Sequence, residues 1–430
     1  MPAPHAVAAP GIVRTPGDPI YRVHLSSGPV GHVWVGSEAV AFTNLGSTDL
    51  STIYLRLWSN GVSGCQPRNA IEITNVVGGT AHALTVNCTA VQVDLDAPLA
   101  PGDRARVAMD LRIQVPARND RFGYHGGLAL FGTALPTLAI DDDAGWHLDP
   151  FVDLGESFYS VVGDYHVSMR MPKSVRVVTT GVATQPTVSP DGHHGATYVA
   201  KGVRDFEWAA GPLRHTIGYV GATRVVVSYV SGLTTAGTAA ASLVAAKRAL
   251  ADLGQAFGRF PYPEMDVVLT EFAAFGGMEY PTIIFTNSSA IYHEMAHQWW
   301  YGIVGDDQFH EPWLDESFAT WSEYVPRGGW RRCRTYAFPD PGARITNDMT
   351  YWGAHPDQYD TIYTGGGCML ATLSHEFGYD RFVHILRWYA AAHWLGIART
   401  ADFKAWIGAA AARLRPGFNV GAFWTRWRVD

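Results

Sequence analysis

A short run of two histidines around a glutamate, followed at a fixed distance by another glutamate, constrains this chain most. The run is His293-Glu294-Met295-Ala296-His297, and eighteen residues lie between it and Glu316. On a helix, residues four apart lie on one face about 6 Å apart, so both imidazoles can point to one place. The pattern therefore predicts a helix through residues 293–297 and another that brings Glu316 to it.

Two imidazoles and one carboxylate form the ligand set of a catalytic zinc ion, because they leave a fourth position for water. We therefore expect His293, His297 and Glu316 to bind one Zn²⁺. Glu294 follows the first ligand and can act as general base on a nearby water. Glu323 lies two turns after Glu316 and is expected to orient a histidine ligand from outside. The motif predicts hydrolysis; the alternative is a helix that carries two surface or core histidines.

The flanking sequence fits this pair of helices. Ser288 and Ser289 can cap the start of the first helix, and the Trp299-Trp300 pair can anchor it in the core. Downstream, residues 312–319 read as a turn leading into the next helix, with Glu316 in its first turn.

Composition limits the possible partners and compartments. A chain of 430 residues, 47% of them hydrophobic, can form two or three domains. A formal charge of −7 provides no basic surface for nucleic acid. No apolar run approaches the length of a transmembrane helix. Residues 1–19 lack the basic and apolar regions of an intact signal peptide and are expected to form a disordered leader.

The four cysteines are Cys65, Cys88, Cys333 and Cys368. None forms a CxxC pair, which disfavours a thiolate metal site. They fall two by two in the halves of the chain, which allows Cys65–Cys88 and Cys333–Cys368 disulfides; free buried thiols are the alternative. Two disulfides would imply a secreted or extracytoplasmic protein.

Residues 20–215 are expected to form an N-terminal β domain, because short β-rich runs alternate there with Gly, Pro, Asn and Asp. Regular spacing of such runs indicates an antiparallel sandwich or saddle. The expected strands are Val33–Phe42, Thr52–Leu57, Ala83–Leu95, Ala105–Val115, Tyr165–Met171 and Val175–Thr180.

Residues 216–430 are expected to form the catalytic domain. It would begin with strands at 217–220 and 223–230, and Ala236–Phe257 has helical apolar spacing. Met265–Leu269 is a further strand candidate, while Asp380–Leu395 and Ala401–Arg413 read as helices.

Two further segments carry candidate site residues. Gly276, Gly277 and Met278 precede Glu279, and glycines beside an extended segment allow close approach of a ligand to the backbone. This segment is a candidate substrate-binding edge, with Glu279 as anchor for a positive group; the alternative is a bulged edge strand. Tyr363 could donate a hydrogen bond to an oxyanion, although its position alone does not select it.

Other polar residues have plainer interpretations. No competing ligand spacing occurs among the later histidines, which are expected to be satisfied or solvent-facing. They are His310, His355, His375, His384 and His393. The run Asp141–Asp143 is expected to be a solvated loop, with calcium binding as an alternative.

These motifs together resemble the aminopeptidase N family of zinc metallopeptidases. The metal motif matches the family's HExxH-x18-E signature, and Gly276–Pro281 is similar to its GxMEN exopeptidase motif. Trp313–Ala319 matches its WLNEGFA segment, and Tyr363 stands at the catalytic tyrosine of its YxKG segment. The β half resembles compact actinobacterial members that lack the large C-terminal helical domain.

The resemblance implies an α+β multidomain fold, in which a β sandwich or saddle precedes a thermolysin-like mixed α/β and helical catalytic domain. It implies an aminopeptidase for peptides with a free N-terminus, and Glu279 would bind the α-ammonium group. Tyr280 replaces the family's Asn, Gly365 replaces its Lys, and the family's other amine-binding residue is not identified; Glu156 and Asp141–Asp143 are candidates.

Two other functions remain open. A zinc endopeptidase would share the metal ligands without using Glu279 as an amine anchor. A non-catalytic binding module would keep zinc only for structure, but it would have no use for Glu294 as a base. The chain is expected to be a monomer. Its cleft is expected to be comparatively open, because little sequence follows Glu316.

Overall fold

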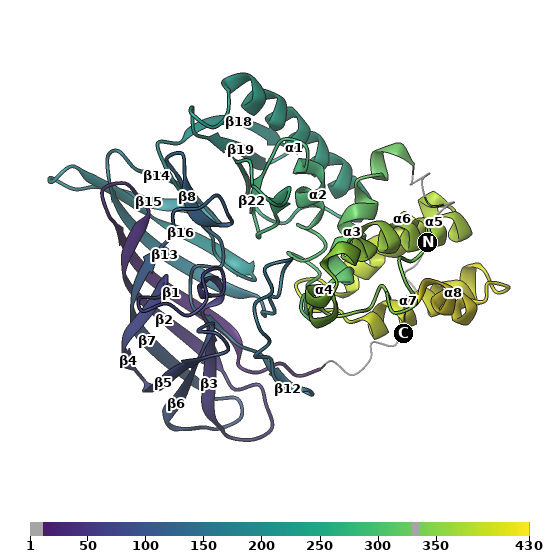
Figure 1. Ribbon diagram of the computed structural model, residues 1–430, viewed down its shortest axis with the longest axis horizontal. Coiled ribbons are helices and arrows are strands. Elements are labelled where there is room, and N and C mark those ends of the chain that lie inside the picture. Colours follow the sequence, from purple (N-terminus) through teal and green to yellow (C-terminus); the bar gives the residue numbers. More distant parts are fainter. Residues whose placement is uncertain (1–11, 329–332, 334–335, 430) are drawn as a thin grey trace.

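The computed structural model describes residues 12–328, 333 and 336–429, which form an α+β protein of several sheets and helices. In Figure 1 the N-terminal strands lie on the left and the C-terminal helices on the right. The sheet that contains β18, β19 and β22 lies with helix α1 at the top of this view. No helix among the described residues is both long and apolar enough to cross a membrane.

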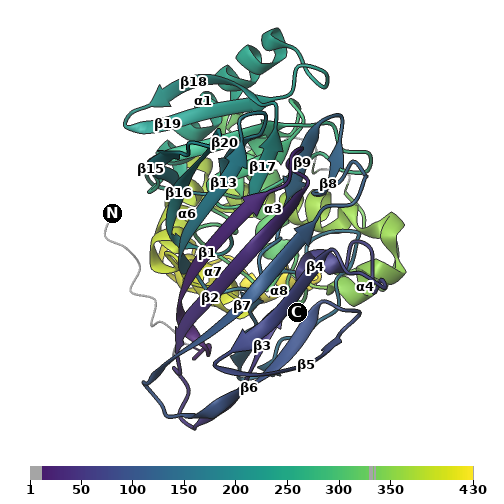
Figure 2. The same ribbon diagram turned by 90° about the vertical axis from the view of Figure 1, so that its left-hand side faces the viewer.

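A seven-stranded sheet forms the outer face of the N-terminal half, and Figure 2 shows its strands side by side. All its ladders are antiparallel except one, because β1 and β13 pair in parallel with Ile20 opposite Asp164. The expected antiparallel pairing of this half therefore fails at the β1–β13 ladder. In order across the sheet, the strands are β15 (Val182–Val188), β16 (His193–Val203), β13 (Gly163–Pro172), β1 (Gly17–Ser27), β2 (Val33–Thr43), β7 (Arg104–Gln114) and β4 (Ile71–Val77).

Two four-stranded sheets and a hairpin complete this half. One sheet contains β10 (Thr137–Leu138), β3 (Leu50–Arg56), β6 (Ala90–Leu99) and β5 (Gly79–Thr85). The other contains β14 (Arg176–Thr179), β17 (Trp208–Gly211), β9 (Leu128–Phe131) and β8 (Phe122–His125). The hairpin is β11 (Asp141–Asp142) with β12 (Gly145–Trp146), and the 3₁₀ helix η1 (Trp58–Asn60) follows β3.

A five-stranded mixed sheet starts the second half. Its order is β18 (Arg214–Val220), β19 (Thr223–Tyr229), β20 (Glu264–Leu269), β22 (Ile283–Thr286) and β21 (Gly277–Met278). The inner ladders β19–β20 and β20–β22 are parallel, and the outer ladders are antiparallel. Helix α1 packs on β18 and β19, while α2 packs against β22 and β21. This sheet therefore holds the start of the metal-motif helix.

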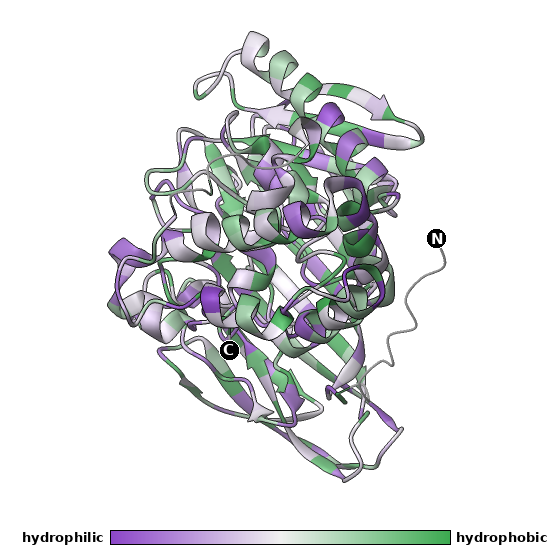
Figure 3. Cartoon of the chain, turned by 90° about the vertical axis from the view of Figure 1, so that its right-hand side faces the viewer, coloured by the Kyte–Doolittle hydropathy of each residue, from purple (hydrophilic) through white to green (hydrophobic). Residues whose placement is uncertain are grey.

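Helix α1 lies between β19 and β20 in the chain, and the other α-helices follow the sheet. The bounds of all the described α-helices are as follows. They are α1 (Ala236–Phe257), α2 (Ile291–Ala296), α3 (Trp313–Ser322), α4 (Met349–Ala354), α5 (Gly366–Phe377), α6 (Tyr379–Ala392), α7 (Thr400–Leu414) and α8 (Val420–Trp427). The short helices are η2 (Val325–Arg327), η4 (Pro356–Gln358) and the π-helix η5 (Thr361–Gly365). In Figure 3 hydrophilic and hydrophobic segments alternate along the C-terminal helices, as expected of helices with one buried face.

Several expected boundaries shift. The strand expected at Ala83–Leu95 is split, because the chain turns at Val86–Thr89, where three successive residues have positive φ. Ser288 and Ser289 do not cap α2. Instead the side-chain oxygen of Asn287 accepts hydrogen bonds from the backbone N–H groups of Ser289 and Ala290.

The expected domain limits can be compared with these elements. Strand β1 begins at Gly17, within the segment 1–19 expected to be a leader, and residues 1–11 of that segment lie outside the described residues. The expected boundary at 215/216 falls inside β18. Both cysteine pairs are disulfide-bonded, as Cys65–Cys88 and Cys333–Cys368.

Three buried apolar clusters hold the described chain together. One fills the N-terminal sheets and another lies between α1 and the C-terminal helices. The third joins the halves, because Trp58, Leu128 and Phe158 pack there with Met278 and Phe285. The strand that carries the Gly276–Glu279 segment is therefore anchored from both sides.

Candidate active site

The three predicted metal ligands converge on one point. Helix α2 carries His293, its C-cap residue is His297, and the first turn of α3 carries Glu316. Nε2 of His293 lies 3.1 Å from Nε2 of His297 and 3.1 Å from Oε2 of Glu316. Nε2 of His297 lies 3.4 Å from the same oxygen. Three donor atoms thus face one small volume.

Neighbouring groups fix the orientation of each ligand. Nδ1 of His293 lies 3.0 Å from Oε1 of Glu323, and Nδ1 of His297 lies 3.0 Å from the backbone oxygen of Trp300. These bonds leave both Nε2 atoms available to a metal. Burial raises the pKa of Glu316, but the nearby histidines outweigh this effect and hold it well below its ordinary value. The Glu316 carboxylate is therefore ionised, as a metal ligand must be.

Glu294 lies against the substrate-edge segment. It is 4% exposed, and a β-carbon built on Gly277 would come within 2.5 Å of its Oε1. Glycine therefore allows the backbone of β21 to approach this carboxyl closely. Burial raises the pKa of Glu294 to about 7, although His293 and His297 act in the opposite direction. A carboxyl with a pKa near neutrality can both accept and return a proton.

Tyr363 lies on the other side of the ligand set. It belongs to the π-helix η5, and its hydroxyl donates a 2.8 Å hydrogen bond to Oε1 of Glu316. Its ring stacks on His293 with centroids 6.0 Å apart. Burial, followed by the charge of Glu316, raises the pKa of Tyr363 well above its ordinary value, so the phenol keeps its proton.

Glu279 lies in the same buried region. One of its carboxylate oxygens is within 4.8 Å of a ring nitrogen of His297. Oε1 also accepts a 3.2 Å hydrogen bond from Nε2 of Gln308, which donates another to Asp315. Burial and then the charge of Glu156 raise the pKa of Glu279 well above its ordinary value. A positive group beside it would favour its ionised form.

The N-terminal half contributes a buried ion pair to this region. Nη1 of Arg121 donates a 2.7 Å hydrogen bond to Oε1 of Glu156, and both side chains are at least nine-tenths buried. Glu156 interacts electrostatically with Glu279 and Glu316. Arg121 and Gln308 had no signal in the sequence, because neither lies in a motif and their positions depend on the tertiary fold.

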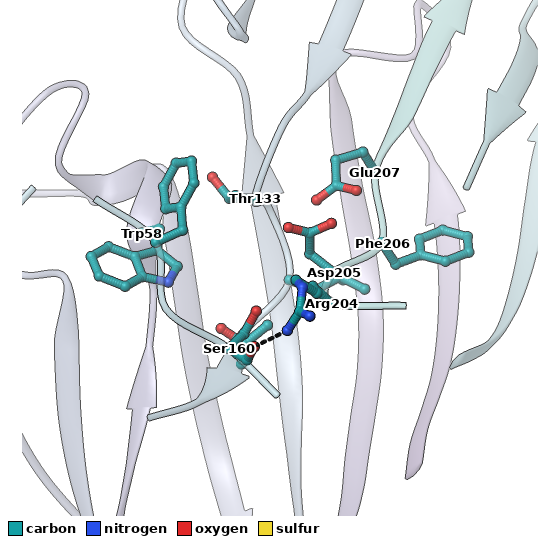
Figure 4. A pocket seen from close by; sticks show the side chains of 10 residues that line it. Trp58, Thr133, Ser160, Arg204, Asp205, Phe206 and Glu207 are labelled. Carbon is teal, nitrogen blue, oxygen red and sulfur yellow. Dashed lines mark hydrogen bonds between the residues drawn. The ribbon is translucent and has the colours of Figure 1, made fainter. Parts of the chain in front are cut away.

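Two further features lie away from the ligand set. Asp142 of the Asp141–Asp143 run is not solvated, because Arg399 forms an ion pair with it and with Asp143. A small cavity in the N-terminal half is lined by Trp58, Arg204, Asp205 and Glu207, with none of the motif residues (Figure 4). It is therefore separate from the ligand set.

Comparisons with known proteins agree with the motifs. No protein-family model matches the chain. It is 27% identical over 203 residues to the alanine/arginine aminopeptidase of Saccharomyces cerevisiae, covering 39% of this chain and 23% of that protein. It is 26% identical over 157 residues to aminopeptidase N of Lactococcus lactis, covering 33% and 18%. The chain thus spans less than a quarter of the length of these curated relatives.

Solved structures extend the similarity over almost the whole chain. The M1 zinc metallopeptidase from Deinococcus radiodurans superposes with a TM-score of 0.66 at 17% identity, covering 95% of this chain and 92% of that one. A mutant of it bound to a Tyr-Ser-Ala substrate gives a TM-score of 0.67 at 18% identity, covering 95% and 93%. The fold is shared, and the resemblance to aminopeptidase N-like proteins is confirmed.

Proposed function

We propose that this chain is a zinc-dependent aminopeptidase that removes the N-terminal residue of peptides. His293, His297 and Glu316 would hold the ion, because two imidazole nitrogens and an ionised carboxylate face one point. This donor set suits a catalytic zinc site. When bound, zinc supplies Lewis acidity that polarises a carbonyl and makes water more acidic.

The remaining chemistry belongs to side chains. Glu294 would take a proton from the attacking water and later give it to the leaving amine, consistent with its pKa of about 7. Tyr363 would turn its hydroxyl from Glu316 to the oxyanion that develops on the substrate. Glu323 would keep the His293 ring in place.

The position of Glu279 favours an aminopeptidase over an endopeptidase. A buried carboxylate beside His297, with Gln308 as its hydrogen-bond donor, is suited to receive a free α-ammonium group. Such a group would offset the repulsion from Glu156. An internal segment of a longer peptide has no α-ammonium group to place there. Gly276, Gly277 and Met278 would form the edge along which the substrate lies.

Paired substrates test this function. We expect hydrolysis of aminoacyl-arylamides and short peptides, loss of activity with a chelator, and recovery on addition of Zn²⁺. The same peptides with an acetylated N-terminus should be cleaved far more slowly. Equal cleavage of both forms would instead establish an endopeptidase, and no hydrolysis of any substrate would indicate a non-catalytic module.

We also infer the organisation and setting of the protein. The N-terminal sheets would form a sandwich or saddle domain, and the chain from β18 onward a thermolysin-like catalytic domain. The two disulfides are compatible with an extracellular location, so we propose a secreted or extracytoplasmic monomer that acts on peptides. Size-exclusion chromatography with light scattering tests the monomer.

A further inference from the structure

Another cluster of histidines and carboxylates lies where the two halves of the chain meet. His147 and Asp149 follow the hairpin strand β12, whereas Asp307 and His310 lie in the loop before α3. One donor atom each from His147, Asp149 and His310 lies within 4.8 Å of the other two. The Nδ1 atoms of His147 and His310 lie 3.2 and 2.9 Å from Oδ2 of Asp307. Four potential ligands therefore converge from two parts of the molecule.

A carboxylate orients the His147 ring, as is common for histidines that bind metals. Its Nε2 atom lies 2.9 Å from Oδ1 of Asp142, and Oδ2 of Asp142 is in turn bound by Arg399 and Tyr159. A carboxylate on one imidazole nitrogen fixes the ring and its tautomer, so that the other nitrogen can bind a cation. Asp307 is fixed as well, because its Oδ1 accepts backbone N–H groups from Phe309 and His310.

The other nitrogen of His147 lacks a hydrogen bond. The side chain is 8% exposed, and Nδ1 is shielded from solvent without a hydrogen-bond partner among the described residues. The same Nδ1 atom lies 3.8 Å from Oδ2 of Asp149 and 3.2 Å from Oδ2 of Asp307. Buried polar atoms are rarely left unsatisfied, and each such atom calls for an explanation. A cation among these donors would satisfy the nitrogen and both carboxylates.

We propose that His147, Asp149, Asp307 and His310 form a second divalent-cation site, distinct from the His293–His297–Glu316 set, that binds zinc. Two imidazoles and two carboxylates supply the nitrogen and oxygen ligands that Zn²⁺ accepts in a four-coordinate structural site. The His310 side chain is 45% exposed, which gives the ion a route from solvent. The ion would join the loop at 307–310 to the N-terminal half.

This site would also stiffen a part of the candidate active site. Gln308 lies between two of the proposed ligands and donates hydrogen bonds to Glu279 and Asp315. A metal that fixes Asp307 and His310 would therefore fix Gln308. That consequence for Glu279 rests on the proposed aminopeptidase function, whereas the existence of the site does not.

Zinc stoichiometry tests the proposal on the whole chain. The purified protein is stripped with chelator, incubated with Zn²⁺, freed of excess metal and analysed for zinc per chain. We expect two equivalents for the unaltered protein and one for a His293→Ala/His297→Ala variant. The double change Asp149→Asn/His310→Gln should also leave one equivalent. Peptide hydrolysis should persist with a raised KM, because Gln308 is then held less firmly beside Glu279. Combining all four changes should leave none.

Matched controls exclude general effects. His82 and Asp94 form an exposed pair 2.7 Å apart in the N-terminal sheets, so His82→Gln/Asp94→Asn should keep two equivalents. In the His293→Ala/His297→Ala variant, Zn²⁺ should raise the Tm and Co²⁺ should give visible absorption bands. A folded His293→Ala/His297→Ala variant that binds no zinc would overturn the proposal and show a metal-free cluster of ion pairs. Peptide hydrolysis, measured separately on the unaltered protein, decides the proposed function.

Discussion

At the scale of single residues, the site depends on carboxyl groups that share a buried region but have different partners. Glu316 is held ionised by histidines, whereas Glu279 and Glu294 have their pKa values raised by burial. Environments that separate the pKa values of neighbouring acids allow them to take different roles. One can serve as a metal ligand while another exchanges a proton.

Replacement of Glu294 by Gln tests its role as the base. The amide keeps the shape of the side chain but cannot accept the proton, so we expect kcat to fall about 10²–10⁴-fold. Zinc content should stay unchanged, because Glu294 is not a proposed ligand. Steady-state kinetics and metal analysis check both points, with Glu376→Gln, at a surface ion pair with Arg415, as the control. Full activity in Glu294→Gln would contradict the mechanism.

Glu38 gives a prediction for stability against pH. It lies within β2, is 1% exposed, and neither carboxyl oxygen has a hydrogen-bond partner among the described residues. Burial raises the pKa of Glu38 well above its ordinary value. The folded protein thus keeps a proton that the unfolded chain loses above about pH 4.3, and its stability falls by about 1.4 kcal/mol per pH unit from there to the folded pKa.

Glu38→Gln should remove this dependence. Compared with the unaltered protein, the variant should gain stability between about pH 4 and about pH 7, because the amide has no proton to lose. Urea unfolding at both pH values measures the gain. The control is Glu72→Gln, at a partly exposed ion pair with Arg112, unfolded under the same conditions. If the stability difference between Glu38→Gln and the unaltered protein were the same at both pH values, titration of Glu38 would not contribute to the pH dependence of stability.

At the scale of helices and strands, the sequence predicted those whose bounds depend on residues nearby in the chain. Helix α1 has the predicted bounds, because its apolar spacing is regular and the Thr235 side chain caps it at Thr238. The parallel β1–β13 ladder was missed because it joins segments far apart in the chain. The start of α2 was predicted wrongly, because Ala290 is its N-cap residue and no side chain caps it, while Asn287 holds the preceding turn.

The close approach of β21 to α2 predicts the effect of a single methyl group. Gly277 is fixed opposite Thr286 in the β21–β22 ladder, so the backbone cannot move away easily. In Gly277→Ala the new methyl would displace the Glu294 carboxyl, and we expect kcat to fall about 10²-fold. Gly408→Ala, in α7 with open space around it, should leave kcat unchanged. Equal kcat in both variants would show that the close contact between Gly277 and Glu294 does not matter for catalysis.

The Cys333–Cys368 disulfide anchors the helix that follows Tyr363. It closes a loop with a sequence separation of 35, and removal of such a constraint costs about 4 kcal/mol by chain entropy. We expect Cys333→Ser/Cys368→Ser to lower both Tm and kcat, because α5 continues directly from η5. Cys65→Ser/Cys88→Ser should lower Tm alone, since its loop lies in the N-terminal half. Unchanged activity in Cys333→Ser/Cys368→Ser would show that this disulfide is not needed to position Tyr363.

At the scale of the whole molecule, the sequence predicted that His293, His297 and Glu316 meet, but not which residues surround them. The motif residues are close in sequence or follow one another in order, so their meeting could be predicted. Gln308 reaches Glu279 from a loop of the same half. The Arg121–Glu156 pair approaches Glu279 only because the two halves pack together. Their positions depend on a seam built from the third apolar cluster, which no local pattern reveals.

Arg204 lies on that seam and binds three backbone carbonyl groups. Nε donates to Tyr301 at 2.6 Å, Nη1 to Ser160 at 2.9 Å, and Nη2 to Gly396. The bond to Ser160 is drawn in Figure 4. The side chain thus joins the end of β16 to the loop after α2 and to the loop between α6 and α7. One buried cation connects both halves of the chain.

Arg204→Met should therefore weaken the whole molecule and not one element. It leaves the carbonyl oxygens of Tyr301 and Ser160 without this donor and removes one of two donors to Gly396. Charged hydrogen bonds contribute about 1.5–3 kcal/mol each, so we expect a loss of about 3–5 kcal/mol. Arg68→Met, at an exposed pair with Glu72, should change stability by less than about 0.5 kcal/mol. Chemical unfolding followed by tryptophan fluorescence, to which both halves contribute, and separately by activity compares loss of the fold with loss of the site. If the two halves are joined through Arg204, activity and fluorescence will be lost together at a lower denaturant concentration, whereas loss of activity far ahead of fluorescence would limit Arg204 to a local role.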